Sequence, residues 1–312
     1  MKRILVSGIT GFLGASIAES LLEKGMEVIG LRRNQSNLKR CESFRYKIQW
    51  VNIDENNWKS LLVKLTPKVF IHSAWIGVNN VSRNIWEDQL KNIDFSFNLL
   101  EAAREAGIEK FIGLGSQAEY GVFNNVVSEN TQVKPETAYA SVKVALSQLI
   151  NTYCQQEKIN FFWIRVFSVF GEGEDDNWLI PSLVRNIMTK ESMDFTLCDQ
   201  KYAYLYIKDF ANAVVSVVES DFLPEGVYNL SSDQPVVLKK LITYIRDYLK
   251  PDFQLNFGKI SYRENQSMHI EGDVKKIQAF IGKIETANFE KKLMSTVDFF
   301  VDLYNKEKNE SV

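Results

Sequence analysis

Tyr139 and Lys143 have side chains and a spacing that suit acid–base chemistry. They are four residues apart in a stretch with a helical pattern, so both side chains lie on one face of the helix. An ammonium group beside a phenol favours the phenolate, and we expect it to lower the pKa of Tyr139 from about 10. The phenol could then donate or accept a proton near neutral pH. The alternative interpretation is a pair of half-exposed helix residues.

Three glycines near the N-terminus lie between an apolar run and a helical stretch. Glycines in that position allow a tight turn, a close backbone approach to a pyrophosphate and close helix–sheet packing. Their spacing is G-x-x-G-x-x-G rather than G-x-G-x-x-G, and a purely structural turn is the alternative. We predict a nicotinamide dinucleotide site whose contacts include Gly8, Thr10, Gly11, Phe12, Leu13 and Gly14.

Arg32 and Arg33 stand at the end of the second expected strand, where an NAD-binding chain carries an Asp or Glu for the ribose. Two guanidinium groups suit a 2′-phosphate, which a carboxylate would repel. We therefore favour NADP(H) over NAD(H), with a solvated strand end as the alternative. Ile53 and Asp54 follow the third strand and are expected to lie beside the adenine, although Asp54 could instead cap the next helix.

The composition is that of an ordinary globular protein, with 312 residues, 37 basic and 39 acidic side chains and a net charge of −2. This balance predicts neither a nucleic-acid nor a membrane partner. The three cysteines have no metal-ligand or redox spacing, which favours a reducing compartment, no disulfides and no metal site. The apolar run at 3–7 is too short for a signal peptide or a membrane span, so we expect a cytoplasmic protein.

Short apolar runs alternate with helical stretches over the first half of the chain. This alternation predicts an α/β fold of the Rossmann type, a doubly wound parallel sheet covered on both faces. We expect strands at 3–7, 27–31, 47–51, 68–73, 110–115 and 161–166, and helices at 11–24, 58–65, 85–106 and 139–156. The alternation weakens after Gly171, which predicts a smaller C-terminal substrate-binding α/β domain. We assign 1–170 and about 204–220, where a strand and helix return to the main sheet, to the NADP-binding domain, and 171–203 and 221–305 to the smaller one.

The motifs together resemble the extended short-chain dehydrogenase/reductases that modify nucleotide sugars. The resemblance runs from Gly8 to about Gly282 and includes His72-Ser-Ala-Trp75 and Arg165-Val-Phe-Ser-Val-Phe-Gly171. It implies that Ser116 hydrogen-bonds the substrate oxygen, Tyr139 exchanges the proton and Lys143 holds the nicotinamide ribose. A ketone that accepts a hydride develops an alkoxide, which a serine and a phenol can stabilise. A plain turn residue is the alternative for Ser116. Further cofactor contacts are expected at Ser73, Ala74, Trp75, Asn92 and Val166.

The loop after Ser116 separates the reactions of this family. The dehydratases carry an Asp-Glu pair there, whereas this chain has Gln117 and Ala118, with Glu119 one residue too late. Enzymes that couple double epimerisation to reduction need a cysteine in this loop and a histidine base, and only His72 and His269 are present. The chain is most similar to 4-ketoreductases of the CDP-abequose or dTDP-fucose synthase type. We expect NADPH-dependent reduction of a nucleotide-linked 4-keto-6-deoxy sugar for surface polysaccharide. A 4-epimerase that retains NAD, or a non-catalytic NADPH-sensing regulator, is the alternative.

The second half is expected to bind the nucleotide diphosphate of the sugar. The family's Arg-Asp pair is Tyr202-Ala203 here, so Lys201 is expected to supply the phosphate charge. Helices 85–106 and 139–156 carry more apolar residues than one sheet face needs. By the same resemblance they form a four-helix interface in a homodimer, with a deeper internal core as the alternative. The expected substrate contacts are Ser116, Gln117, Ser168, Asn177, Lys201 and Arg263.

Overall fold

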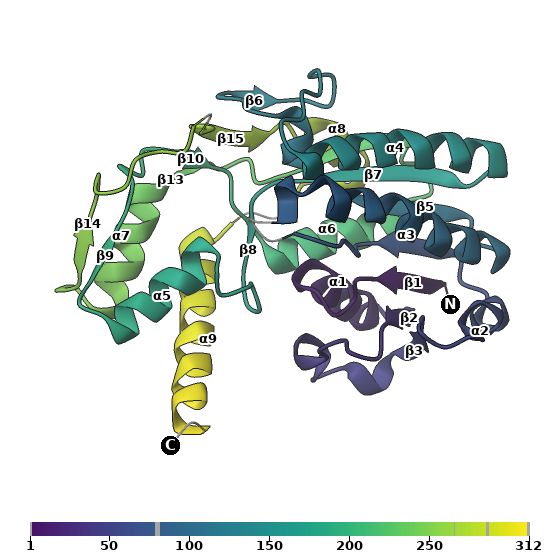
Figure 1. Cartoon of the computed structure of the whole chain (residues 1–312), viewed down its shortest axis with the longest axis horizontal. Helices are drawn as coiled ribbons and strands as arrows, with labels where there is room; N and C mark the ends of the chain where they lie inside the picture. The colour runs from purple at the N-terminus through teal and green to yellow at the C-terminus, as the bar shows by residue number, and fades with distance from the viewer. Residues whose placement is uncertain (1, 79–81, 265, 285–286, 311–312) are drawn as a thin grey trace.

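The larger part of the molecule is a seven-stranded parallel sheet (Figure 1). In this computed structural model residues 2–78, 82–264, 266–284 and 287–310 are described. The inner strands of this sheet are buried on both faces, and their sequences are continuous apolar runs, as parallel sheets require. In spatial order the strands are β12 (Gly226–Leu230), β7 (Asn160–Val166), β5 (Lys110–Ser116), β4 (Val69–His72), β1 (Arg3–Ser7), β2 (Glu27–Arg32) and β3 (Gln49–Asn52).

Helices cover both faces of this sheet, each over its own hydrophobic core. On one face α1 (Phe12–Glu23) packs against α6 (Ile207–Glu219). On the other face α3 (Trp86–Glu105) packs against α2 (Trp58–Leu65) and α4 (Ala138–Glu157). The doubly wound α/β fold predicted from the sequence is therefore confirmed.

The smaller part has its own core among α5 (Leu179–Thr189), α7 (Leu238–Leu249) and α9 (Phe289–Glu310). Figure 1 shows these helices to one side of the main sheet. A mixed sheet joins the two parts, because β6 (Val126–Val127) comes from the first half of the chain. The other strands of this mixed sheet are β13 (Val236–Val237), β10 (Lys201–Tyr202) and β15 (His269–Gly272). A separate two-stranded sheet is formed by β9 (Ser192–Asp194) and β14 (Gln254–Asn256), and α8 (Lys275–Ile281) packs near β12.

Two elements differ from the sequence prediction. The strand expected in the segment 204–220 is β11 (Leu205–Tyr206), which pairs with β8 (Val169–Phe170) outside the main sheet. Only α6 of that segment packs on the sheet. The seventh strand is instead β12, within 221–305. Its buried Asn229 interrupts the apolar pattern, and its amide bonds to the Val127 carbonyl and the Tyr120 hydroxyl.

Short 3₁₀ helices shape the loops at the ends of the strands. These are η1 (Lys39–Cys41), η2 (Arg45–Lys47), η3 (Ser82–Asn84) and η4 (Gln117–Tyr120). Of the helices that the structure describes, none is both long and apolar enough to cross a bilayer.

Candidate functional site

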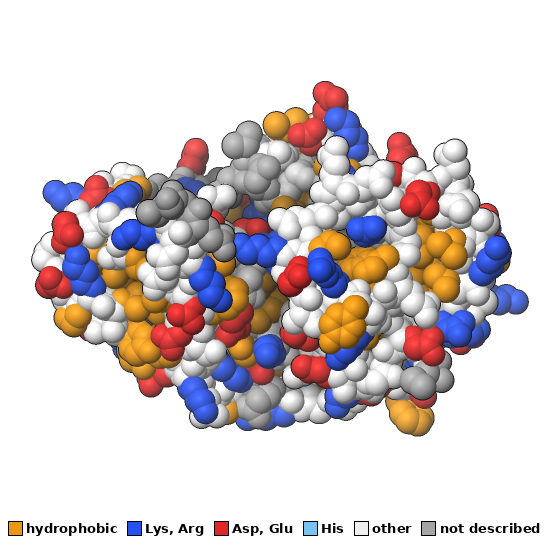
Figure 2. Space-filling view, turned by 90° about the horizontal axis from the view of Figure 1, so that it is seen from below, with side chains coloured by type: hydrophobic (Ala, Val, Ile, Leu, Met, Phe, Trp, Pro, Cys, Tyr) orange, Lys and Arg blue, Asp and Glu red, His pale blue; other side chains and the backbone are white. Residues whose placement is uncertain are grey.

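A cleft of about 960 Å³ is lined by residues of both parts of the molecule. In Figure 2 a hollow separates the two parts, with charged side chains along its margins. The cleft touches the carboxyl ends of β1, β2, β4 and β5, where ligands bind in open parallel sheets. The predicted site residues on its wall are Gly8, Thr10, Gly11, Phe12, Leu13, Arg32, Arg33, Ile53, Ser73, Ala74, Trp75, Ser116, Gln117, Tyr139, Val166, Ser168 and Arg263.

Six predicted site residues are not on that wall as the structure describes it. Gly14, Asn92 and Lys143 are buried behind it, and Asp54, Asn177 and Lys201 lie outside it. Asn177 and Lys201 are each next in sequence to lining residues, namely Trp178 and the pair Gln200 and Tyr202.

The glycine turn packs closely against the neighbouring backbone at the start of α1. Gly8 has φ +67°, and a Cβ on it would lie 2.5 Å from the Ala74 backbone nitrogen. A Cβ on Gly14 would lie 2.2 Å from the Gly8 carbonyl oxygen, so Gly14 serves close packing. Gly11 is the N-cap of α1 and offers no side-chain acceptor to the first N–H groups of the helix. These N–H groups suit the diphosphate of a dinucleotide.

The end of β2 gathers positive charge on the same cleft. Arg32 and Arg33 both line it, and the buried Nε of Arg32 has no hydrogen-bond partner among the described residues. Asp54 accepts a hydrogen bond from the backbone N–H of Asn34 at 2.8 Å. The N-cap of α2 is Asn57, so Asp54 holds the loop after β2 rather than capping that helix.

Ser116 and Tyr139 meet on the cleft wall. Ser116 ends β5, and Tyr139 lies in the first turn of α4, where Thr137 caps the helix by accepting from the Ala140 N–H. The Ser116 hydroxyl is close enough to the phenol to lower the pKa of Tyr139. A hydroxyl and a phenol placed together can stabilise and protonate an oxygen that gains negative charge.

The pKa of Tyr139 corrects the prediction made from its spacing. Burial raises this pKa above 10, whereas the nearby Arg83 and the hydrogen bond from Ser116 lower it. The Arg83 guanidinium lies 4.5 Å from the centre of the phenol ring, against 5.9 Å for Lys143 Nζ. The expectation of a lowered pKa is therefore wrong for the protein alone, because desolvation outweighs the neighbouring charges. Arg83, which sequence reasoning missed, is the cation nearer to the ring.

Lys143 is enclosed in the protein. Its Nζ donates to the Leu114 carbonyl at 2.6 Å and lies 3.7 Å from the centre of the Trp75 indole. Burial lowers the pKa of Lys143 to about 7, with Glu119 raising it and Arg83 lowering it. Lys143 is therefore only partly charged near neutral pH.

Glu119 holds the Ser116 loop from beneath. Its carboxylate is fully buried and accepts from the Ser116 N–H at 2.8 Å, from Trp163 Nε1 at 3.0 Å and from Arg165 Nε at 2.8 Å. Ser116 Oγ in turn accepts from the Ala118 N–H, which completes a capping box. The Ser-x-x-Glu pattern was the sequence signal for this role. Glu119 thus points away from the cleft.

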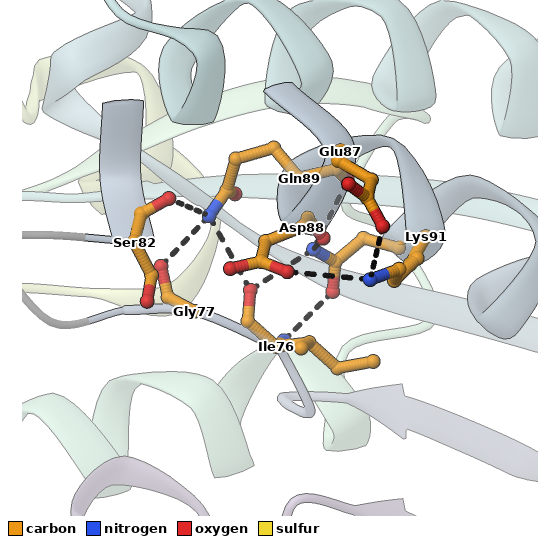
Figure 3. A network of polar contacts seen from close by, with 8 residues as sticks. Ile76, Gly77, Ser82, Glu87, Asp88, Gln89 and Lys91 are labelled. Carbon is orange, nitrogen blue, oxygen red and sulfur yellow. Dashed lines mark hydrogen bonds and ion pairs between the residues drawn. The ribbon is translucent and has the colours of Figure 1, made fainter. Parts of the chain in front are cut away.

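Asn92 and Gln89 fix the loop after β4 (Figure 3). Both are fully buried and lie one turn apart on α3. Asn92 accepts from the Ile76 N–H at 2.7 Å and donates to the Ile76 carbonyl at 3.0 Å, while Gln89 donates to the carbonyls of Gly77 and Ser82. On the outer side of the helix Lys91 pairs with Glu87 and Asp88 (Figure 3). Asn92 therefore positions the cleft wall rather than forming it.

His72 is a buried residue at the end of β4. Its two ring nitrogens bond to the Ser7 hydroxyl at 2.8 Å and the Ser96 hydroxyl at 2.9 Å. Burial and the Lys143 charge lower the pKa of His72 to about 3, so the ring is neutral at ordinary pH.

The part of the cleft in the smaller lobe contains buried polar atoms that have no hydrogen-bond partner among the described residues. Gln200 is buried and its Oε1 has no hydrogen-bond partner in the described part of the chain, and the same holds for Glu174 Oε2. Burial and Asp175 raise the pKa of Glu174 well above its usual value. Arg263 and Tyr202 lie on the same wall. Buried polar atoms of this kind fit a ligand rich in hydrogen-bonding groups. Sequence reasoning missed Glu174 and Gln200.

Comparisons with known proteins place these features in a family. A model of the NAD dependent epimerase/dehydratase family matches residues 4–231. The chain is 23% identical to the CDP-abequose synthase of Salmonella muenchen over 278 residues, covering 86% of this chain and 87% of that protein.

Solved structures share the fold. The UDP-N-acetylglucosamine 4-epimerase from Methanobrevibacter ruminantium M1, solved with UDP-N-acetylmuramic acid, superposes with a TM-score of 0.85 at 24% identity, over 97% of this chain and 99% of that one. The UDP-glucuronic acid 4-epimerase from Bacillus cereus, solved with UDP-glucuronic acid and NAD, gives 0.83 at 22% identity, over 97% and 100%. With the matched residues spanning most of the sequence, this chain belongs to the NAD dependent epimerase/dehydratase family.

Proposed function

We propose that the protein is a nucleotide-sugar 4-epimerase that oxidises and re-reduces C4 of the sugar. The observation that carries the proposal is the contact between Ser116 and Tyr139 on a cleft whose loop offers no second acid or base. Gln117 and Ala118 follow Ser116, and both Glu119 oxygens are occupied by buried partners. These residues suit carbonyl–alcohol exchange at one carbon, and they do not suit loss of water.

The chain's own residues would handle the proton. Tyr139 in its phenolate form would take the proton of the C4 hydroxyl as the carbonyl forms, and Ser116 would donate a hydrogen bond to the same oxygen. NAD, held by the glycine turn, would supply the hydride chemistry at C4. Once the keto sugar has turned, Tyr139 gives its proton back to the new alkoxide. Protons and electrons then balance over one cycle.

The nucleotide diphosphate would lie toward the smaller lobe. Arg263 on the wall offers a guanidinium fork for phosphate oxygens, and Gln200 and Glu174 offer polar atoms to hydroxyl or base groups. The names of the similar proteins support this substrate class, since several act on, or were solved with, UDP-linked sugars.

A second candidate is a 4-ketoreductase that consumes NADPH with a nucleotide-linked 4-keto-6-deoxy sugar. The observation in its favour is the pair Arg32 and Arg33 on the cleft, with the unpaired Arg32 Nε. Two guanidinium groups there suit the 2′-phosphate of NADP(H). The likeness to CDP-abequose synthase points the same way.

One set of incubations tests both candidates. Purified protein would be mixed with NAD and either UDP-glucose, UDP-N-acetylglucosamine or UDP-glucuronic acid, and separately with NADPH and CDP- or dTDP-linked 4-keto-6-deoxyglucose. The epimerase predicts the C4 epimer by NMR with no net change in cofactor absorbance, and no product from Tyr139→Phe. If NADPH is consumed in step with the keto sugar, the protein is the reductase and not the epimerase. Tight NADPH binding with no product from either set would favour a sensing regulator.

We also propose that the enzyme forms a homodimer through α3 and α4. These helices pack together and leave Trp86, Leu90 and Leu149 about half exposed. Two copies could bury these side chains in a bundle of four helices. Light scattering should report a dimer for the native chain and a monomer for Leu149→Asp, and a native monomer would refute this arrangement. A cytoplasmic location stays a prediction.

A further inference from the structure

The Lys143 ammonium is buried against an aromatic ring and has no carboxylate as an ion-pair partner among the described residues. Lys143 is 6% exposed, and no carboxylate in the described ranges pairs with its Nζ. The contacts of Nζ are the Leu114 carbonyl at 2.6 Å and the Trp75 indole, 3.7 Å from Nζ to the ring centre. The carboxylate that raises the pKa of Lys143 is that of Glu119, whose oxygens accept hydrogen bonds from Arg165 and Trp163.

Trp75 is itself held by two neighbouring side chains. Its indole N–H donates to Gln89 Oε1 at 2.9 Å, and its ring meets the Tyr139 ring edge-on, with 5.7 Å between ring centres. Gln89 is fully buried and fixed by its bonds to Gly77 and Ser82 (Figure 3). The ring that covers Lys143 is therefore oriented by α3, not only by the loop that carries it.

We propose that Trp75 is the positioning residue of Lys143, its indole face holding the buried ammonium charged and in place beside Tyr139. A cation on the face of a tryptophan is attracted by the ring quadrupole, and the attraction is strongest away from water. Gln89 sets the angle of that face. The inference rests on the proposed function only for the use of Lys143 in cofactor binding, since the contact itself belongs to the protein alone.

The charged and titratable groups around Lys143 affect its pKa, which can be measured. Glu119 raises the pKa of Lys143, and Arg83 lowers it. His72 stays neutral, and Tyr139 is a phenol. The ammonium form is thus present below about pH 7 and is lost as the pH rises through that value. Removing the indole face should move this loss to lower pH.

The experiment compares Trp75→Leu with Trp75→Phe in protein carrying ¹³Cε-lysine. The Lys143 resonance is identified by its absence from Lys143→Met, and its pKa is followed by NMR. A desolvated cation–π contact shifts the ratio of charged to neutral lysine by about thirtyfold, so Trp75→Leu should lower the pKa of Lys143 by about 1.5 units. Trp75→Phe keeps an aromatic face and should lower it by less than half of that.

A tryptophan that merely fills space predicts the opposite sign. Leucine would then admit water, hydrate Lys143 and raise its pKa. A raised or unchanged pKa in Trp75→Leu, or equal shifts in both variants, overturns the proposal. Gln89→Leu tests it independently should Trp75→Leu not fold, because a released indole should lower the pKa of Lys143 by a smaller amount.

Binding of NADH then tests the functional consequence without any turnover. Trp75→Leu should weaken NADH binding more than tenfold at about pH 7.5 and only about twofold at about pH 5.5. At the lower pH, Lys143 is charged in most wild-type molecules and in about half of the variant molecules. An equal loss at both pH values refutes a role through the lysine charge. Absence of epimerase and reductase activity would refute the proposed function and leave both measurements standing.

Discussion

Replacing Arg83 by methionine should raise the pKa of Tyr139 further. The Arg83 guanidinium carbon lies 4.5 Å from the centre of the phenol ring, and Arg83 opposes the effect of burial more strongly than any other described group. At an effective dielectric constant of about 20, unit charges at this distance interact by about 3.7 kcal/mol. Arg83 is only half-buried, so solvent reduces this value, and we expect a rise of about 1 to 2 units.

The assay is an NMR titration of ¹³Cζ-tyrosine protein, with the Tyr139 signal identified by Tyr139→Phe. Arg83→Lys is the matched control, because it keeps a positive charge in the same loop and should recover most of the difference. If Arg83→Met leaves the pKa of Tyr139 unchanged or lowers it, the electrostatic reasoning is refuted. Turnover at neutral pH should fall in Arg83→Met and recover in Arg83→Lys, since the phenol must exchange a proton in the proposed cycle.

Three further changes test the groups that shape the site. Glu119→Gln leaves the Arg165 cation buried without its partner and should cost about 3–5 kcal/mol of stability in urea unfolding, part of which Glu119→Gln/Arg165→Met should recover. Gly14→Ala places a Cβ 2.2 Å from the Gly8 carbonyl oxygen, so it should destabilise by about 1–3 kcal/mol and abolish NADH binding measured by fluorescence. The pKa of His72 lies near 3 when folded, below its unfolded value, so its contribution is present above about pH 6.5 and is lost as the pH falls toward 3. The free energy of unfolding of the wild type should therefore fall by up to about 5 kcal/mol more than that of His72→Gln over that interval. Parallel plots of unfolding free energy against pH for the two proteins would contradict this assignment.

The Rossmann core was readable from the sequence because buried parallel strands are continuous apolar runs. The first strand and the helix at 58–65 have the predicted bounds, as β1 and α2. The strand β12 was not readable, since Asn229 interrupts it one residue before its end and is satisfied by groups distant in sequence. The two-residue strands of the smaller lobe are too short to show any periodicity.

The glycine turn and the residues on the cleft wall follow from local spacing. The surroundings of Tyr139 do not, because Arg83 approaches it from a loop 56 residues earlier in the sequence. Burial also depends on the whole fold, which is why the sign of the Tyr139 pKa shift could not be read from its neighbour four residues on. Glu119, in contrast, was within reach of local reasoning through the capping-box pattern.

In the proposed 4-epimerase, which would have to run in both directions, the raised pKa of Tyr139 would have a use. A buried phenol has few water molecules to screen it, so any charge brought beside it acts strongly. An oxidised nicotinamide ring is positively charged and a reduced ring is neutral. Beside a bound oxidised ring the Tyr139 phenol would lose its proton more readily, and beside a reduced ring it would hold its proton more firmly. Arg83 opposes the effect of burial, so the pKa of Tyr139 is raised less than it would be without that cation.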